Sequence, residues 1–152
     1  MKDSVILKIK RLRPDTDIDI PLPEYMSPQA AGLDLYAGIG EDILMMPGDI
    51  VLVPTGLALS IPNGYEVQIR PRSGLAVKHG IGIINAPGTI DSDYRGEIHV
   101  ALINFSKLEF MIRRGDRIAQ MILSRVYRAS FELVDELDNT LRSNGGFGHT
   151  GR

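Results

Sequence analysis

The sequence predicts an all-β domain, a barrel or sandwich of eight or more strands accompanied by one short helix. Three observations support this fold class. Apolar and polar residues alternate with a period of two in several short runs, as they do in half-buried strands. Turn signals separate these runs, and 16 glycines and 9 prolines are scattered between the apolar segments. The 152 residues are enough for one domain with a core of its own.

The alternating runs locate the expected strands. Within a run, most apolar residues fall on one face and most polar residues on the other. In the last run Gln120 shares a face with Ile118 and Ile122, so a buried amide there would need a polar partner. The four clearest runs cover residues 5–9, 65–70, 97–102 and 117–122.

One short helix is expected in the segment RSGLAVKHG. Ser73 is expected to be its N-cap, because a serine hydroxyl can accept a hydrogen bond from the first turn. Gly80 is expected to end the helix, since glycine adopts the left-handed conformation of a helix terminus without strain. Turn signals between the strands occur at residues 47–49, 62–64, 87–88 and 115–116.

The C-terminal residues differ from the rest of the chain. We expect a β domain of residues 1–134, followed by a flexible, glycine-rich arm of residues 135–152. The arm offers only Leu137, Leu141 and Phe147 as apolar anchors, so it cannot bury enough surface to become ordered by itself. A partner or a ligand could order it.

The composition excludes several classes of function. There is no cysteine, which excludes disulfides, thiolate metal sites and cysteine nucleophiles, and the three histidines lack metal-ligand spacing. A net charge of −2 argues against a protein that coats nucleic acid, whereas a free nucleotide needs only a local basic site. The N-terminus lacks the apolar core of a secretory signal, and no apolar stretch is long enough to span a membrane. We therefore expect a cytoplasmic protein without a membrane partner.

The segment RPRSGLAVKHG is a candidate anion site. Arg70 and Arg72 are two residues apart, so in an extended strand they project to the same side. The helix that follows begins with free backbone N–H groups, which together with a guanidinium bind anions well. The alternative is a plain strand-to-helix turn with exposed arginines. The segment is not a Walker A loop, because the pattern GxxxxGK[ST] is absent from the sequence.

The segment NAPGTIDSDYRGEIHV is a candidate catalytic hairpin. If the hairpin pivots near Ser92, Asn85 lies roughly across from His99. Asp91 near the tip could hold a water molecule and take its proton as a general base. The alternative is that Asp91 only forms a β-turn and that Tyr94 packs on its own hairpin.

Two further segments carry weaker signals. AAGLDLYAG reads as an ordinary half-buried strand with one carboxylate, Asp34. In RSNGGFGHTGR, glycines allow backbone N–H groups to approach a phosphate closely, and Arg142 adds positive charge. Phe147 has no local packing partner there, so a base or a sugar would suit it. The alternative is a disordered glycine-rich tail.

Taken together, five segments resemble, in order and in wording, the five motifs of the homotrimeric deoxyuridine triphosphatase (dUTPase) family. The resemblance begins at about residue 25 and continues to the C-terminus, so it covers most of the chain. The segments are AGLDLYA, PRSGLA, GTIDSDYRGE, GDRIAQMI and RSNGGFGHTG.

The resemblance implies a fold, an assembly and a reaction. The fold would be a jelly-roll-like β-barrel, and three chains would form a threefold trimer with three shared active sites. One subunit would supply segments like PRSGLA and GDRIAQ, a second the hairpin, and a third the arm that closes the site. The reaction would be hydrolysis of dUTP to dUMP and pyrophosphate, which lowers dUTP and supplies dUMP for thymidylate synthesis.

The resemblance also implies roles for individual residues. Asp91 would activate the water that attacks the α-phosphorus, and Tyr94 would pack under the deoxyribose. Mg²⁺ would be held by the triphosphate and water, without a direct protein ligand, and Asp34 would be an outer-shell partner. The remaining substrate-binding residues would be Arg72, Ser73, Gly74 and Gln120 for the phosphates, Asn85, Thr89, Ile90 and His99 in the uracil-reading hairpin, and Arg142, Phe147, Gly148 and His149 in the arm.

Two other functions remain to be distinguished. A dCTP deaminase would share the fold and the trimer, but its second motif resembles R-S-S-x-A-R, and this chain has Gly74 and Val77 at the second Ser and the final Arg. A non-catalytic nucleotide-binding regulatory trimer would retain the pocket. Such a binder has no need for a base at Asp91 beside the α-phosphate.

Overall fold

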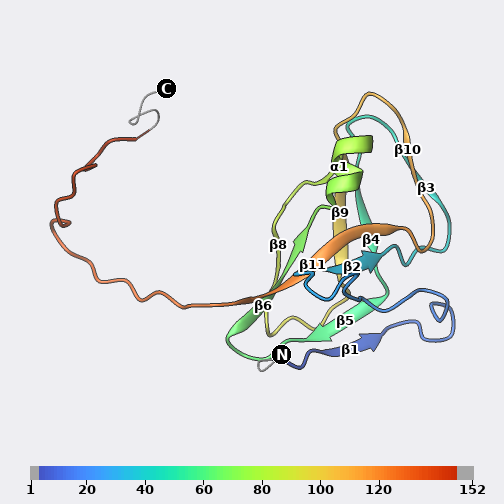
Figure 1. Ribbon diagram of the computed structural model, residues 1–152, viewed down its shortest axis with the longest axis horizontal. Coiled ribbons are helices and arrows are strands. Elements are labelled where there is room, and N and C mark those ends of the chain that lie inside the picture. Colours follow the sequence, from blue (N-terminus) through green and yellow to red (C-terminus); the bar gives the residue numbers. More distant parts are fainter. Residues whose placement is uncertain (1–3, 147–152) are drawn as a thin grey trace.

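The chain folds as an all-β domain with one short helix, as the sequence predicts. The computed structural model describes residues 4–146. Within this range it contains eleven strands and one helix (Figure 1). In chain order the elements are β1 (Lys8–Arg11), β2 (Leu33–Tyr36), β3 (Ile43–Met45), β4 (Ile50–Pro54), β5 (Leu57–Ser60), β6 (Tyr65–Arg70), α1 (Ser73–His79), β7 (Ile81–Ile83), β8 (Gly88–Ile90), β9 (His99–Asn104), β10 (Phe110–Ile112) and β11 (Arg117–Arg125).

The strands pair antiparallel in four sheets. The largest has the order β2-β11-β6-β8, and a three-stranded sheet has the order β4-β9-β7. Two smaller sheets pair β1 with β5 and β10 with β3. Among residues 4–146 these hydrogen bonds do not join into one continuous barrel, and the strands surround a shared apolar core instead.

The core follows the alternation read from the sequence. In β6, Val67 and Ile69 are 0% and 3% exposed, whereas Gln68 is half-buried and Arg70 is exposed. The run around β9 behaves in the same way, because its aliphatic residues are buried and His99 is exposed. Strands from all four sheets contribute to the core, with side chains that include Leu35, Met45, Val53, Val67, Leu102 and Ile112.

A β-bulge in β11 corrects one expectation. The register of β11 against β2 shifts between Arg117 and Ala119, and a bulge of this kind interrupts the alternation of side chains. Ile118 is therefore buried in the core together with Ala119 and Met121, while Gln120 is only half-buried. The expectation that Ile118 and Gln120 share a face is wrong, because a period-2 pattern cannot reveal an inserted residue.

The helix ends as predicted but begins one residue earlier than expected. Arg72, in an extended conformation, is the N-cap of α1, and no side chain caps the helix. Ser73 is therefore its first helical residue and not its cap. Gly80 ends the helix in the left-handed conformation with φ of 66°, and its N–H bonds back to Ala76. No helix in the described part of the chain is long and apolar enough to cross a membrane.

The chain leaves the body of the domain after β11. The Val126 N–H still donates to the Gly64 carbonyl oxygen at 2.9 Å. From residue 127 to residue 146 the chain has no strand or helix, and Figure 1 shows it running outward, away from the strands. Phe131, Leu133 and Leu141 in this segment are fully exposed.

Candidate active site

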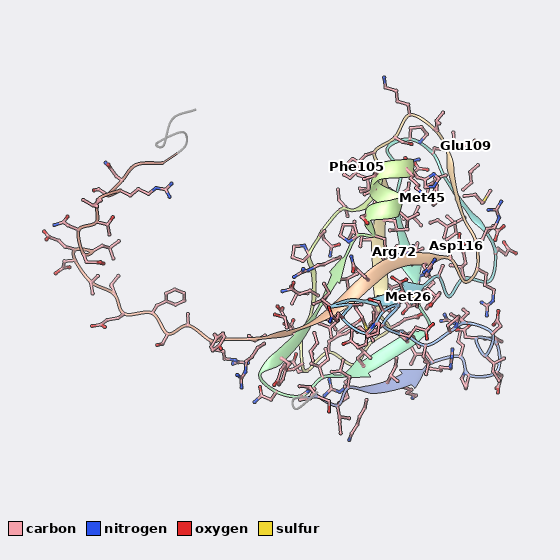
Figure 2. The ribbon with its side chains drawn as sticks, viewed as in Figure 1. Met26, Met45, Arg72, Phe105, Glu109 and Asp116 are labelled. Atoms are coloured by element: carbon pink, nitrogen blue, oxygen red, sulfur yellow. The ribbon has the colours of Figure 1, made fainter. Side chains whose placement is uncertain are left out.

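The first candidate pocket lies between the start of α1, β2 and β11. It has a volume of about 420 Å³ and contains three cationic or anionic side chains together with glycine and small residues. Figure 2 labels two of its residues, Arg72 and Met26, which lie one above the other beside β11 and β2. The residues that line it are Met26, Ala30, Ala31, Gly32, Asp34, Arg72, Ser73, Gly74, Arg117 and Gln120. The structure thus brings together residues of three of the five sequence segments.

Asp34 organises the charges of this pocket. Its Oδ1 accepts a hydrogen bond from Arg72 Nε at 3.2 Å, and its Oδ2 accepts one from Arg117 Nη1 at 3.2 Å. Asp34 is 8% exposed and lies in a strand that is buried on both faces, not half-buried as its pattern suggests. One carboxylate between two guanidinium groups leaves the pocket with net positive charge, which suits an anionic ligand.

The environment of Asp34 also acts on its neighbour Tyr36. Burial raises the pKa of the Tyr36 hydroxyl above its ordinary value of 10.0, and the carboxylates of Glu24 and Asp34 raise it further. Tyr36 therefore stays protonated over the physiological range. It adds no negative charge near the two arginines.

Gln120 is positioned at the edge of the same pocket. Its Nε2 donates to the Pro71 carbonyl oxygen at 3.0 Å, so the amide is tied to the segment just before α1. Gly32 lies directly against it, because a Cβ at position 32 would clash with the Gln120 amide oxygen. The polar partner expected for Gln120 is thus a backbone carbonyl, and the amide faces the pocket.

A second candidate pocket contains Asp91. It has a volume of about 300 Å³ and is formed by β8, the turn that follows it, the start of β9 and one side chain of β4. The residues that line it are Leu52, Thr89, Ile90, Asp91, Tyr94, Glu97 and His99. Five of these seven were expected at a substrate site, namely Thr89, Ile90, Asp91, Tyr94 and His99.

The turn after β8 is built differently from the expected hairpin. The Tyr94 N–H donates to the Asp91 carbonyl oxygen at 3.2 Å, which closes a β-turn over Ser92 and Asp93. The Tyr94 hydroxyl donates to the Glu97 carbonyl oxygen at 2.9 Å, so the ring folds back on its own turn. Both local alternatives considered for Asp91 and Tyr94 are therefore present, and both side chains still line the pocket.

β7 pairs with β9 in a register that leads Asn85 towards His99: Ile83 faces Leu102, and the Ile84 N–H still donates to the Ala101 carbonyl oxygen at 3.0 Å. β8 pairs with β6, and β9 pairs with β4 and β7, so no two-stranded hairpin extends to the turn. Asn85 is exposed in the loop between β7 and β8, next to Gly88. No backbone hydrogen bond joins Asn85 to His99 in the described structure, because the chain turns after Ile84, where the Ala86 N–H donates to the Ile83 carbonyl oxygen at 3.2 Å.

The two pockets are separate on one chain. Asp91 lines a pocket to which Arg72 and Gln120 do not contribute. The described residues of the arm, up to residue 146, contribute to neither of them: the Arg142 Nε donates to the Gly145 carbonyl oxygen at 2.8 Å within an exposed turn. The predicted arm residues Phe147, Gly148 and His149 lie outside the described residues.

Metal ligands are not clustered in the described structure. Residues 4–146 contain no group of three or more His, Cys, Asp or Glu side chains arranged to hold a metal ion. Asp34 has both oxygens engaged by arginines, so it is poorly placed as a direct ligand and better placed to act through a water molecule.

The structure adds residues that the sequence analysis did not select. Arg117 stands in the segment GDRIAQMI and pairs with Asp34, and Glu97 ends the segment GTIDSDYRGE and lines the second pocket. Both residues lie inside segments that resemble family motifs, and this position is the signal that could have identified them. Arg70 has no part in either pocket, because its guanidinium is bound to Gln68 Oε1.

The fold and the first pocket define a class of protein: an all-β domain with an arginine-rich anion pocket at a strand-to-helix junction. A family model described as dUTPase matches residues 18–151. The chain therefore belongs to the dUTPase family, as its five motifs predict.

Curated relatives agree with this assignment. The deoxyuridine 5'-triphosphate nucleotidohydrolase of Syntrophotalea carbinolica is 52% identical over 148 residues, which cover 97% of this chain and 98% of that protein. The protein of the same name from Desulfotalea psychrophila is 56% identical over 132 residues, or 87% of this chain and 88% of that protein.

Solved structures confirm the fold. The dUTPase of Staphylococcus bacteriophage 80alpha, determined with dUpNHpp, superimposes with a TM-score of 0.85 at 23% identity and covers 98% of this chain and 100% of that one. A dUTPase from phage phi11 of S. aureus superimposes with a TM-score of 0.77 at 21% identity, covering 89% of this chain and 100% of that one. Its description mentions a structural Mg(II) ion. At these identities the comparison shows the jelly-roll-like fold.

Proposed function

We propose that this chain hydrolyses dUTP to dUMP and pyrophosphate, through attack of a water molecule on the α-phosphorus. The observation that carries the proposal is the pair of pockets. One is cationic and formed by Arg72, Arg117 and Gln120, and the other contains the carboxylate of Asp91. Relatives at 52% identity carry the name of this activity. Hydrolysis would lower dUTP and supply dUMP for thymidylate synthesis.

The phosphate chain binds in the first pocket. Arg72 is fixed by Asp34, so its remaining N–H groups are oriented without the entropy cost of ordering a free side chain. Ser73 and Gly74 are the first residues of α1, where backbone N–H groups lack intrahelical acceptors. Gln120, whose Nε2 donates to the Pro71 carbonyl oxygen, adds an amide close to the start of α1.

The nucleoside binds in the second pocket. Thr89 and Ile90 belong to β8, whose backbone presents hydrogen-bonding groups to the uracil edge. Asn85, in the loop before β8, reads the same edge of the base. Tyr94 packs under the deoxyribose and leaves no space for a 2′-hydroxyl, and His99 lines the same pocket.

Asp91 acts as the general base. It is exposed and lies at the end of β8, so a water molecule reaches its carboxylate directly. The carboxylate orients the water towards the α-phosphorus and accepts its proton as the new P–O bond forms and pyrophosphate leaves. Because the chain has no cysteine and needs no covalent intermediate, positioning and charge neutralisation carry the reaction.

The site fits a nucleotide-bound Mg²⁺ better than a protein-bound one. No described cluster of side chains can hold the ion, and both Asp34 oxygens face arginines. Mg²⁺ would arrive on the triphosphate, with Asp34 contacting one of its waters, and would neutralise phosphate charge there. Arg72 and Gln120 then orient the phosphate oxygens that the ion leaves free.

A homotrimer completes the site. On one chain, Asp91 and Arg72 line different pockets, so a complete site needs residues from more than one subunit. Exposed apolar residues on β4, namely Ile50 and Leu52, give such an assembly a surface to bury. The arm of a third subunit closes the site, with Arg142 on the γ-phosphate, Phe147 stacked on uracil, and Gly148 and His149 near the phosphates.

Pyrophosphate release from dUTP tests this function directly. Purified chain should release pyrophosphate from dUTP with Mg²⁺ and should release no ammonia from dCTP. Ammonia from dCTP would instead identify a deaminase of the same fold. Tight dUTP binding without pyrophosphate release would identify a regulatory binder.

A further inference from the structure

The loop before β2 is attached to the body through Arg13. The Arg13 Nε donates to Asp17 Oδ2 at 2.9 Å, and Nη2 donates to the Gly38 carbonyl oxygen at 2.9 Å. Nη1 reaches across 84 residues of chain to Glu97 Oε1 at 3.1 Å. One guanidinium therefore connects the N-terminal loop to a residue that lines the second pocket.

Glu97 connects Arg13 to the second pocket. Its carboxylate also accepts the Gly56 N–H at 2.8 Å, so the side chain is held from two directions. Its backbone carbonyl oxygen accepts the Tyr94 hydroxyl at 2.9 Å and lies 3.1 Å from His99 Nδ1. The position of Glu97 thus sets the position of two side chains proposed to contact the nucleoside.

Two glycines allow the chain of contacts to close. Gly56 has φ of +72°, and a Cβ there would clash with the Asp17 carboxylate and approach Arg13 Nη2 to 3.1 Å. At Gly96 a Cβ would clash with the Tyr94 hydroxyl. The absence of a side chain at Gly56 and at Gly96 therefore leaves room for Arg13 and Tyr94 to reach Glu97.

The ion pair between Arg13 and Glu97 is partly shielded from solvent, so it can hold the Glu97 side chain in place. Asp17 is 2% exposed, and the Glu97 side chain is 19% exposed against 38% for Arg13. Without Arg13, the Glu97 carboxylate would keep the Gly56 N–H and its 4.0 Å approach to His99 Nε2, and it would be freer to turn towards water. A shift of Glu97 would move the Tyr94 hydroxyl with it, because the hydroxyl bonds to its backbone.

We propose that Arg13 is a positioning residue for the nucleoside pocket: through Glu97 it fixes Tyr94 and His99, and so sets discrimination against a 2′-hydroxyl. The discrimination rests on the proposed function; the positioning rests on the contacts alone. Arg13 itself touches no substrate. By holding Glu97, Arg13 keeps the Tyr94 ring in the position where it leaves no space for the 2′-hydroxyl of a ribonucleotide.

Arg11 provides a matched control. It holds the same loop through Nη1 to the Asp17 carbonyl oxygen and Nη2 to the Ile20 carbonyl oxygen, both at 2.7 Å. None of its hydrogen bonds in the described structure involves Glu97. Arg11→Gln and Arg13→Gln should therefore both loosen the loop, and only the second should disturb the pocket.

The test has one readout that does not depend on catalysis. The chain has five tyrosines, so fluorotyrosine labelling should give five ¹⁹F resonances, with Tyr94 assigned from its loss in Tyr94→Phe. We expect Arg13→Gln to shift the Tyr94 resonance and Arg11→Gln to leave it in place. Glu97→Gln, which keeps the size of the side chain, should shift it as well and serves if Arg13→Gln does not fold.

The second readout is the ratio of kcat/KM for dUTP to that for UTP. Arg13→Gln should lower this ratio by about tenfold, since discrimination by one small group is of this order, and Arg11→Gln should not change it. A purely structural role would reduce both rates equally and leave the ratio unchanged, which would overturn the proposal. If the native chain does not hydrolyse dUTP, the proposed function fails, and the ¹⁹F spectra alone then decide the positioning role.

Discussion

Arg72 and Asp34 are joined across 38 residues of chain, with Nε of the first 3.2 Å from Oδ1 of the second. The pair links β2 to the start of α1, and Arg117 of β11 occupies the other carboxylate oxygen. A single buried carboxylate thereby sets the direction of two guanidinium groups at the mouth of the anion pocket.

Replacing Arg72 by lysine should weaken substrate binding without unfolding the chain. A lysine keeps the charge but cannot hold Asp34 and present a planar fork to phosphate at the same time. We expect KM for dUTP to rise roughly tenfold, or about 1.4 kcal/mol. Steady-state pyrophosphate release measures this. Arg70→Lys is the control, because the Arg70 guanidinium bonds to Gln68; an equal rise in that variant would remove Arg72 from phosphate binding.

Gly32→Ala should displace the side-chain amide of Gln120. The added methyl group meets the Gln120 amide oxygen, the far end of a flexible side chain, so the amide should move while the fold tolerates the change. We expect KM to rise by roughly threefold to tenfold with little change in Tm, as for the loss of one hydrogen bond. Gly40→Ala should leave KM unchanged, because a Cβ there meets nothing within 4 Å. Equal KM values for the two variants would show that Gln120 does not touch substrate.

Asp91→Asn should remove turnover and retain binding. An amide cannot accept the proton of the attacking water, so kcat should fall by about 10²–10⁴-fold, the usual contribution of a general base. Binding of a non-hydrolysable analogue, measured by calorimetry, should persist. Asp93→Asn is the control, since Asp93 is an exposed residue of the same turn and does not line the second pocket. An Asp91→Asn variant that keeps most of its kcat would show that another group activates the water.

Removing residues 142–152 should abolish closure of the site. Without Arg142 and the glycine-rich end, we expect kcat/KM to fall by roughly 100-fold, as when a transition-state donor is lost. Sedimentation velocity should show the same assembly as the full chain, because β11 and the body are intact. Full turnover by the truncated chain would exclude the arm from the mechanism.

Acid should release one anchor of the N-terminal loop. A hydrogen bond from Arg114 lowers the pKa of Asp19 below its ordinary value of 3.8. A lowered folded pKa means that the contribution to stability is present above pH 3.8 and is lost as pH falls through the folded value. Asp19→Asn should therefore lower Tm relative to the native chain near neutral pH, and the difference should vanish in strong acid. Asp15→Asn is the control on the same loop, because the Asp15 side chain makes no hydrogen bond or ion pair among residues 4–146, and it should leave Tm unchanged near neutral pH.

The sequence predicted what depends on near neighbours. The alternation in β6, the end of α1 at Gly80 and the gathering of Thr89, Ile90, Asp91 and Tyr94 all follow from residues close in the chain. The low apolar content of residues 135–152 is likewise a local property, and the flexible arm inferred from it stays a prediction. Family resemblance then supplied the roles that local patterns left undecided.

What the sequence did not predict depends on distant contacts. Ile118 enters the core because a bulge shifts β11 against β2, and no period-2 pattern marks an inserted residue. β8 pairs with β6 and not with β9, and no local pattern marks that long-range choice. The ion pair of Arg13 with Glu97 spans 84 residues, and neither side chain carries a signal of the other.

The separation of Arg72 from Asp91 on one chain has a genetic consequence. If each site combines the two from different subunits, an allele lacking Arg72 and an allele lacking Asp91 are each inactive alone. In a cell that carries both, some mixed trimers would contain a site with an intact arginine from one product and an intact carboxylate from the other. Two null alleles would then complement each other, whereas two alleles damaged in the same pocket would not.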